Sequence, residues 1–197
     1  MQDQLLEDAR RIEECIRPLP SPHSPAALVV VIGLPGTGKS YFCRRLASRH
    51  PLALLESDAL RQALFGQPTH SPEESRRLFA ACHHVLDRLL GAGISALLDA
   101  TNLRETHRRQ LYAIADGHGA KLVLVSLRAS AAVVQERLAA RGRRADPADL
   151  SDAGPEVYEQ MRTLEEPIER PHIVVDASAD IEPAVEVVLR ELKERRQ

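Results

Sequence analysis

From residue 26 onward the chain alternates between short apolar runs and segments with helical periodicity. Residues 26–32 form an unbroken, valine-rich apolar run that ends at Gly33, a pattern typical of a central strand in a parallel sheet. Further apolar runs at residues 52–55, 94–98, 121–127 and 172–175 predict four more strands. Five short strands alternating with helices predict an α/β fold, in which right-handed crossovers cover both faces of a parallel sheet.

Between these runs, apolar residues recur every three or four positions, which predicts amphipathic helices. We expect helices at residues 40–49, 72–90, 131–140, 157–164 and 181–192. Two further helices are predicted from their start signals. Ser57 is a candidate N-cap for a helix that starts near Asp58, and Asn102 with Glu105 resembles a capping box that opens the other.

The first 25 residues follow a different pattern. Leu5, Ala9, Ile12 and Ile16 share one face of a helix predicted over residues 3–17. The proline-rich stretch at residues 18–25 ends this helix and is typical of an extended spacer. We therefore expect an N-terminal helix and spacer at residues 1–25, packed on the main domain or on a second subunit, and a main domain at residues 26–197.

Composition narrows the possible classes of protein. Hydrophobic residues make up 44% and charged residues 27%, as in ordinary soluble proteins, and the net charge of -2 argues against a wholly basic nucleic-acid-binding surface. Aromatic residues make up only 3%, which leaves little for stacking on bases. The three cysteines lack paired spacing, the apolar runs are too short to cross a membrane, and the N-terminus lacks a signal-peptide pattern. These features favour a cytoplasmic protein without a membrane partner.

Residues 33–40 carry the strongest chemical signal, Gly-Leu-Pro-Gly-Thr-Gly-Lys-Ser, placed between an apolar strand and an amphipathic helix. The glycines allow successive backbone N–H groups to turn toward one anion, and the helix adds its N-terminal dipole. Lys39 supplies a charge for the β- and γ-phosphates, and Ser40 a hydroxyl for Mg²⁺. We therefore expect ATP and Mg²⁺ as cofactors, with nucleotide contacts from Gly33, Leu34, Pro35, Gly36, Thr37, Gly38, Lys39, Ser40 and Tyr41.

Acidic and polar residues follow the second and third predicted strands, at the edge of the sheet where ligands bind in such folds. Asp58 could accept a hydrogen bond from a substrate hydroxyl, and Arg61, one turn later, could hold an anionic group. Asp99 could hold Mg²⁺ through a water molecule, and Thr101 and Asn102 add polar groups that we expect to contact the substrate.

Arginines cluster where the helix at residues 131–140 ends. A solvent-exposed surface is the common reason for such a run, but a lid at about residues 141–155 could instead bring arginines onto the transferring phosphoryl group. Arg141 is the first candidate for this catalytic role and Arg137 the second; Arg143 and Arg144 follow in the same cluster.

Together these motifs resemble the P-loop kinases grouped around the polynucleotide kinase domain, zeta toxins and chloramphenicol phosphotransferase. The resemblance covers about residues 28–142 and rests on the segments at 34–40, 57–61, 99–103 and 136–142. It implies a three-layer sandwich with strand order 2-3-1-4-5 and a helical lid, with adenine near residues 176–180. It also implies that Asp58 activates the acceptor, Arg61 contacts a substrate phosphate and Arg141 acts from the lid.

The chain departs from this group in two respects. Phage-type polynucleotide kinases have a functional acid where this chain has Ala100, and Asp99 stands one position earlier. Beyond Gly142 the sequence resembles bacterial predicted kinases without an established substrate more than any member of known substrate.

Three functions remain open at this point. The leading hypothesis is a kinase that transfers the γ-phosphate of ATP to a hydroxyl of a small molecule. A 5′-hydroxyl polynucleotide kinase is favoured by the pair Asp58 and Arg61, but the charge balance, the few aromatics and Ala100 argue against it. A regulatory ATPase would explain the N-terminal helix as a docking element, but would leave Asp58, Arg61 and the arginine cluster without a purpose.

Overall fold

The five apolar runs all form strands of one parallel sheet. The computed structural model describes residues 2–141 and 154–194. Its strands are β1 (Ala27–Ile32), β2 (Ala53–Glu56), β3 (Ala96–Asp99), β4 (Lys121–Arg128) and β5 (Ile173–Asp176). Their order is β2-β3-β1-β4-β5, which confirms the predicted order, and every neighbouring pair is parallel. Because β1 lies at the centre of the sheet, all of its side chains are buried.

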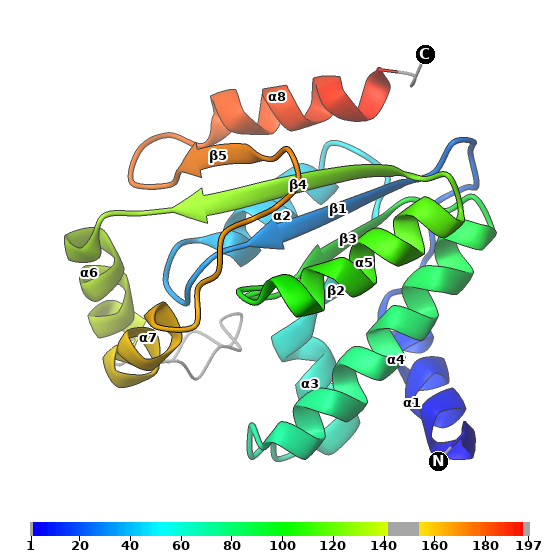
Figure 1. The fold of residues 1–197 in the computed structure, drawn as a ribbon, viewed down its shortest axis with the longest axis horizontal. Helices are drawn as coiled ribbons and strands as arrows, with labels where there is room; N and C mark the ends of the chain where they lie inside the picture. The colour runs from blue at the N-terminus through cyan, green and yellow to red at the C-terminus, as the bar shows by residue number, and fades with distance from the viewer. Residues whose placement is uncertain (1, 142–153, 195–197) are drawn as a thin grey trace.

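Helices cover both faces of this sheet, as the alternation of β1 side chains requires (Figure 1). Leu28, Val30 and Ile32 of β1 face a core shared with α1 (Gln2–Cys15), α3 (Ser57–Phe65), α4 (Pro72–Gly91) and α5 (Glu105–Gly117). Val29 and Val31 face the opposite core, which α2 (Lys39–Ala47) and α8 (Glu182–Lys193) cover. The result is the three-layer α/β fold that the sequence predicts.

The remaining helices, α6 (Ala131–Arg141) and α7 (Pro155–Arg162), lie beyond the carboxyl ends of the central strands (Figure 1). A third apolar cluster forms there from Leu34, Leu103, Val134, Leu138 and Tyr158. Both helices therefore share an apolar cluster with Leu34 of the predicted phosphate-binding loop. Most of the lid expected at residues 141–155 lies outside the described residues.

The N-terminal helix packs on the same chain, which is one of the two alternatives left open by the sequence. Ala9 and Ile12 are buried in the core that α3 and α4 share. Arg11 donates hydrogen bonds to the Ala63 and Leu64 carbonyls at the end of α3, at 2.5 and 3.2 Å. The boundary placed at residue 25 stays a prediction.

Two capping predictions are wrong. The helix α3 begins at Ser57 itself, and Glu56 stands at its N-cap without a side-chain cap. The helix α5 begins at Glu105 after Arg104, again without a side-chain cap. Asn102 is instead held in a left-handed conformation, with φ of 48°, which places it outside any helix. The side chain of Asn102 forms a hydrogen bond with the neighbouring strand instead of capping the helix, as described below.

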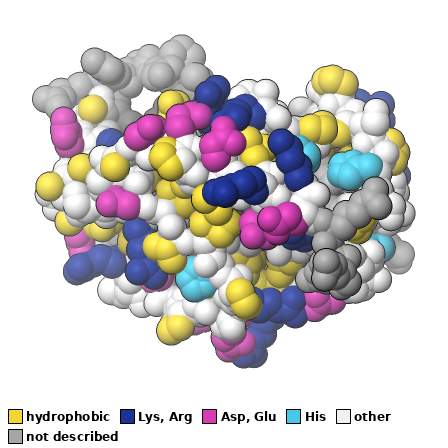
Figure 2. Space-filling view, turned by 90° about the horizontal axis from the view of Figure 1, so that it is seen from above, with side chains coloured by type: hydrophobic (Ala, Val, Ile, Leu, Met, Phe, Trp, Pro, Cys, Tyr) yellow, Lys and Arg dark blue, Asp and Glu magenta, His cyan; other side chains and the backbone are white. Residues whose placement is uncertain are grey.

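The surface over α8 carries both signs of charge. Figure 2 looks down on this helix and shows basic and acidic side chains interleaved. Ion pairs account for part of this pattern, for instance Arg45 with Glu182 at 2.5 Å. The described residues of this face therefore form no broad basic area of the kind that binds nucleic acid. Within the described residues, no helix combines the length and apolarity that a membrane crossing needs.

Candidate active site

The predicted phosphate-binding loop runs from the end of β1 to the start of α2. Gly38 precedes α2 with φ of 93°, a left-handed conformation that strongly favours glycine. A Cβ atom at Gly33 would lie 2.6 Å from the backbone oxygen of Leu127, so the close approach of β4 excludes any side chain there. These two positions explain why the loop needs glycine at both ends.

Hydrogen bonds onto one carbonyl fold the loop into a compact turn. The Leu34 oxygen accepts from Thr37 Oγ1 at 2.8 Å and from Lys39 Nζ at 3.0 Å. Lys39 and Ser40 begin α2, whose first N–H groups have no partner within the helix. The loop therefore presents backbone donors, a helix N-terminus and a lysine together, which is the combination that binds phosphate.

Carboxylates from two strands and one helix lie at the same edge. Glu56 and Asp99 are opposite one another in the register of β2 and β3, and Asp58 lies in the first turn of α3. Asp99 is only 3% exposed, and Ser40 donates a hydrogen bond to its carboxylate. The structure thus brings Lys39, Ser40, Asp58 and Asp99 together, as the sequence predicts.

The electrostatics of this edge are unfavourable for the charged acids. Burial raises the pKa of Asp99, and the Asp58 charge raises it further, while Lys39 and Ser40 act in the opposite direction. Burial also raises the pKa of Glu56, although Arg44 donates a hydrogen bond to it at 2.8 Å. A cation bound at this edge would relieve the repulsion between these carboxylates.

The donor set fits Mg²⁺ held jointly with a nucleotide. A hydroxyl bonded to a buried carboxylate supplies the hard oxygen atoms that Mg²⁺ prefers. In the described part of the chain, no three Cys, His, Asp or Glu side chains gather closely enough to hold a metal by themselves. The protein would therefore supply only part of the coordination, and nucleotide phosphates and water the rest.

Arg61, for which the resemblance implies a contact to a substrate phosphate, is almost fully buried. Its side chain is 8% exposed, donates from Nη2 to Ser75 Oγ at 3.1 Å and pairs through Nη1 with Glu74 at 3.5 Å. Glu74 also accepts from the backbone of Thr69 and His70. The guanidinium thus holds α3 against the start of α4.

Arg137 bridges two loops at the nucleotide side. Its Nη1 donates to the Thr37 oxygen of the phosphate-binding loop at 3.3 Å, and its Nη2 donates to the Ala177 oxygen at 2.7 Å. Ala177 follows β5, where the resemblance places adenine. Arg141 ends α6, but its side chain, together with Arg143 and Arg144, lies outside the described residues.

The polar residues after β3 contact the phosphate-binding strand. The Thr101 oxygen accepts from Gly33 N at 3.1 Å, and Asn102 Nδ2 donates to the Val31 oxygen at 2.8 Å. Asn102 is buried, so its amide group is used within the protein. Tyr41, expected at the nucleotide, is 67% exposed in the first turn of α2.

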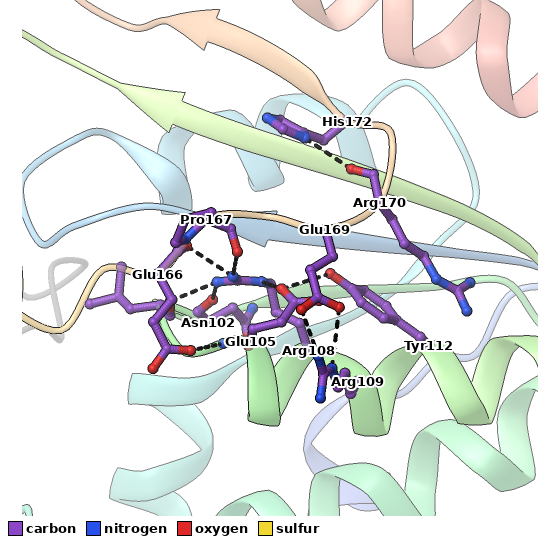
Figure 3. Close-up of polar contacts among 11 residues, drawn as sticks. Asn102, Glu105, Arg108, Arg109, Tyr112, Glu166, Pro167, Glu169, Arg170 and His172 are labelled. Carbon is purple, nitrogen blue, oxygen red and sulfur yellow. Dashed lines mark hydrogen bonds and ion pairs between the residues drawn. The ribbon is translucent and has the colours of Figure 1, made fainter.

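Sequence reasoning missed Arg108, which lies completely buried beside this turn (Figure 3). Its guanidinium binds the backbone of Asn102 and Leu103 and also that of Glu166 and Pro167. An arginine within an amphipathic helix is usually a surface residue, and backbone acceptors leave no mark in a side-chain pattern. No signal in the sequence could have identified it.

Comparisons with known proteins agree with this geometry. Residues 28–168 match a family model described as an AAA domain. A crystal structure of a presumed kinase from Chloroflexus aurantiacus is 25% identical, with TM-score 0.67, covering 86% of this chain and 100% of that one. A gluconokinase from Sinorhizobium meliloti is also 25% identical, with TM-score 0.59, covering 85% of this chain and 91% of that one.

A third structure shares the fold alone. It is Chaetomium thermophilum Kti12 in complex with ADP-AlF3, 20% identical with TM-score 0.67, covering 85% of this chain and 100% of that one. Among curated proteins, no sequence matches this chain. The comparison with known proteins therefore rests on the family match and on the two structures that are 25% identical.

Proposed function

Because the chain belongs to the AAA-domain family, whose model covers more than half of it, we propose that it is a kinase that transfers the γ-phosphate of ATP to a hydroxyl group of a small molecule. One observation carries the proposal. Asp58 shares an edge with Lys39, Ser40 and Asp99, close enough for its charge to act on Asp99. A carboxylate facing a phosphate-binding loop is what a phosphoryl acceptor needs and what nucleotide binding alone does not.

Each residue then has a distinct role in the transfer. The loop amides and Lys39 bind the β- and γ-phosphate oxygens and neutralise their charge. Asp58 accepts the proton of the acceptor hydroxyl while the oxygen of that hydroxyl forms a bond to the γ-phosphorus. The bond between the γ-phosphorus and the bridging oxygen breaks, and that oxygen leaves with ADP. When bound, Mg²⁺ would be held by Ser40 and Asp99 and would neutralise charge on the nucleotide phosphates.

Arg137 supports the nucleotide side of this arrangement. Since it joins Thr37 to Ala177, it fixes the phosphate-binding loop relative to the loop proposed to contact adenine. A direct role of Arg137 or Arg141 in the transfer, and a substrate contact from Thr101 or Asn102, stay predictions.

A small-molecule acceptor is supported by one of the similar solved structures and by the surroundings of Arg61. The gluconokinase, at 25% identity, acts on a small molecule, and most of its length is matched. Arg61, the residue that would hold a phosphate of a polynucleotide, is buried beside Glu74 and Ser75, although its Nη1 has no hydrogen-bond partner among the described residues. The motifs at residues 33–40, 57–61 and 99–103 still support a place in the group around polynucleotide kinases, zeta toxins and chloramphenicol phosphotransferase.

We also propose a cytoplasmic location. Cys15, Cys43 and Cys82 are all free thiols in the structure. Unpaired cysteines are typical of proteins in a reducing compartment.

The proposal is tested with ATP labelled at the γ-phosphate, offered with sugars, sugar acids, nucleosides, antibiotics and 5′-hydroxyl oligonucleotides. We expect label on one small-molecule class, and Asp58→Asn to lower the transfer rate at least about 100-fold, since general-base catalysis contributes on that order. The variant should bind MgATP normally in calorimetry.

Glu73→Gln is the matched control, because Glu73 also lies in the first turn of a helix but is exposed. It should transfer phosphate at the wild-type rate. Full transfer by Asp58→Asn would reject the assignment of Asp58. Hydrolysis of ATP without labelling of any acceptor would favour the regulatory ATPase, and label on oligonucleotides would favour the polynucleotide kinase.

A further inference from the structure

Arg108 is a charged residue buried where charge is costly. Its side chain is 0% exposed, the largest fully buried side chain in the described part of the protein. A guanidinium offers five N–H donors, and here they meet five acceptors within 3 Å. The acceptors are Glu105 Oε2 at 2.6 Å and the backbone oxygens of Asn102 at 2.7 Å, Leu103 at 2.7 Å, Glu166 at 2.9 Å and Pro167 at 2.6 Å.

One side of the guanidinium holds the turn at residues 101–103. Within this turn Asn102 has φ of 48°, a left-handed conformation that costs free energy for any residue other than glycine. Such a conformation persists when its surroundings determine it. Two hydrogen bonds from Arg108 Nη1, to the oxygens of Asn102 and Leu103, are part of those surroundings.

The same turn is bonded to the end of β1. Asn102 Nδ2 donates to the Val31 oxygen, and Gly33 N donates to the Thr101 oxygen. Val31 and Gly33 flank the last residue of β1, where the phosphate-binding loop begins. A change in the shape of the turn would therefore move the start of that loop.

The other side of the guanidinium holds the segment between α7 and β5. Besides the bonds from Arg108, Glu166 N donates to the Leu103 oxygen at 3.0 Å, and Glu105 N donates to the Glu166 carboxylate at 2.7 Å. Figure 3 shows this segment lying across α5, with Arg108 between the two. Arg108 thus lies between the turn and this segment and is hydrogen-bonded to both.

Packing extends the connection to the loop itself. Leu103 of the turn and Leu34 of the phosphate-binding loop share an apolar cluster with Tyr158 of α7. The Leu34 oxygen is the acceptor for Lys39 and Thr37. Polar and apolar contacts therefore lead from Arg108 to the group that orients Lys39.

We propose that Arg108 is a positioning residue for phosphate binding: by holding the turn at residues 101–103, it sets where the phosphate-binding loop starts. This rests on the proposed binding of ATP at that loop. Lysine cannot replace arginine here, because its three donors on one nitrogen cannot reach acceptors on both sides. Arg109, the next residue, is 61% exposed and pairs only with Glu169 among the contacts described, so it offers a matched control.

The test is a double-mutant cycle on the affinity for MgATP, measured by calorimetry at 15 °C after thermal unfolding has confirmed that each variant is folded. We expect Arg108→Lys to weaken binding about tenfold, as small displacements of a positioned group do, and Arg109→Lys to stay within about twofold of wild type. Asn102→Ala should also weaken binding of MgATP. The variant that combines Arg108→Lys with Asn102→Ala should have an affinity no lower than that of the single variant with the lower affinity.

Asn102→Gly separates backbone shape from the side-chain bond, because glycine adopts the left-handed conformation without strain. It should bind MgATP more tightly than Asn102→Ala and more weakly than wild type. Wild-type affinity in Arg108→Lys, or losses that multiply in the double variant, would overturn the proposal. Should Arg108→Lys fail to fold, wild-type affinity in both Asn102 variants would overturn it instead. If the wild-type protein itself binds no MgATP, the proposed function fails, an outcome distinct from these.

Discussion

At the scale of single residues, the candidate site gathers like charges around one lysine. Glu56, Asp58 and Asp99 act on one another, and Asp99 is almost fully buried. Only part of this repulsion is offset by Lys39, by Arg44 and by the Ser40 hydroxyl. The unliganded site is therefore less stable than a neutral one would be, and a bound cation would remove part of that cost.

Asp99→Asn should stabilise the unliganded protein while weakening its binding of MgATP. Since the folded protein raises the pKa of Asp99, the charged carboxylate lowers stability fully above the raised pKa, and the effect is lost as the pH falls toward the ordinary value of 3.8. We expect a Tm higher by about 2–4 °C at pH 8, with the difference shrinking as the pH is lowered toward that ordinary value. Scanning calorimetry without nucleotide measures this, and a lower Tm at pH 8 would contradict it.

Residues whose partners lie close to them in the sequence could be predicted from the sequence. Every part of the phosphate-binding loop, from Gly33 to Ser40, acts within eight consecutive positions, so the sequence pattern contains it. Arg108 could not be predicted, because two of its five acceptors are backbone oxygens at residues 166–167, far along the chain. The capping role expected of Asn102 is wrong, because its side chain bonds to β1, which no local pattern encodes, whereas its contact with a substrate stays a prediction.

At the scale of elements, some helix starts follow from the local sequence and others do not. Ser71 caps α4 by accepting from Glu74 N at 3.2 Å, with Pro72 in the first turn. Ser57 has the sequence signature of a cap but lies inside α3, because β2 runs directly into that helix. A strand that continues without a loop leaves no room for a separate capping residue.

Two serine variants test this difference. Ser71→Ala should lower the free energy of unfolding by about 1 kcal/mol, since it leaves the first turn of α4 without its cap. Ser57→Ala should change the free energy by less than about 0.5 kcal/mol. Urea unfolding of both variants gives the comparison, and an equal loss in the two would restore Ser57 as a cap.

The N-terminal helix shows how elements reinforce the acceptor side. Asp8, 1% exposed, accepts from Arg77 of α4 at 3.0 Å, and Arg77 lies 5.1 Å from the ring centre of Phe65 in α3. With the bonds from Arg11, this joins α1 to both helices. The helix lies outside the residues matched by the family model, yet it packs on the helix that carries Asp58.

At the scale of the whole molecule, the apolar pattern predicts the layers but not the strand order. Five apolar runs and a fully buried β1 follow from burial on both faces of a parallel sheet. The order β2-β3-β1-β4-β5 was inferred only through the resemblance to P-loop kinases. Periodicity reports which face of an element is buried, whereas strand order depends on how crossovers connect, which single residues do not encode.

The same order explains where the site lies. With β1 between β3 and β4, the phosphate-binding loop emerges beside the end of β3, and β2 places Asp58 one strand further along. The phosphate-binding loop and Asp58 thus lie at the same edge of the sheet, on strands separated by β3. The central claim is that ATP bound by this loop passes its γ-phosphate to a hydroxyl compound there.

Transfer of labelled γ-phosphate by wild type, Lys39→Ala and Lys193→Ala tests this claim most directly. Lys39 reaches into the phosphate-binding loop, whereas Lys193 is exposed at the end of α8, so the pair separates the site from general loss of charge. We expect labelled acceptor with wild type and Lys193→Ala, and none with Lys39→Ala. Full transfer by Lys39→Ala would contradict it.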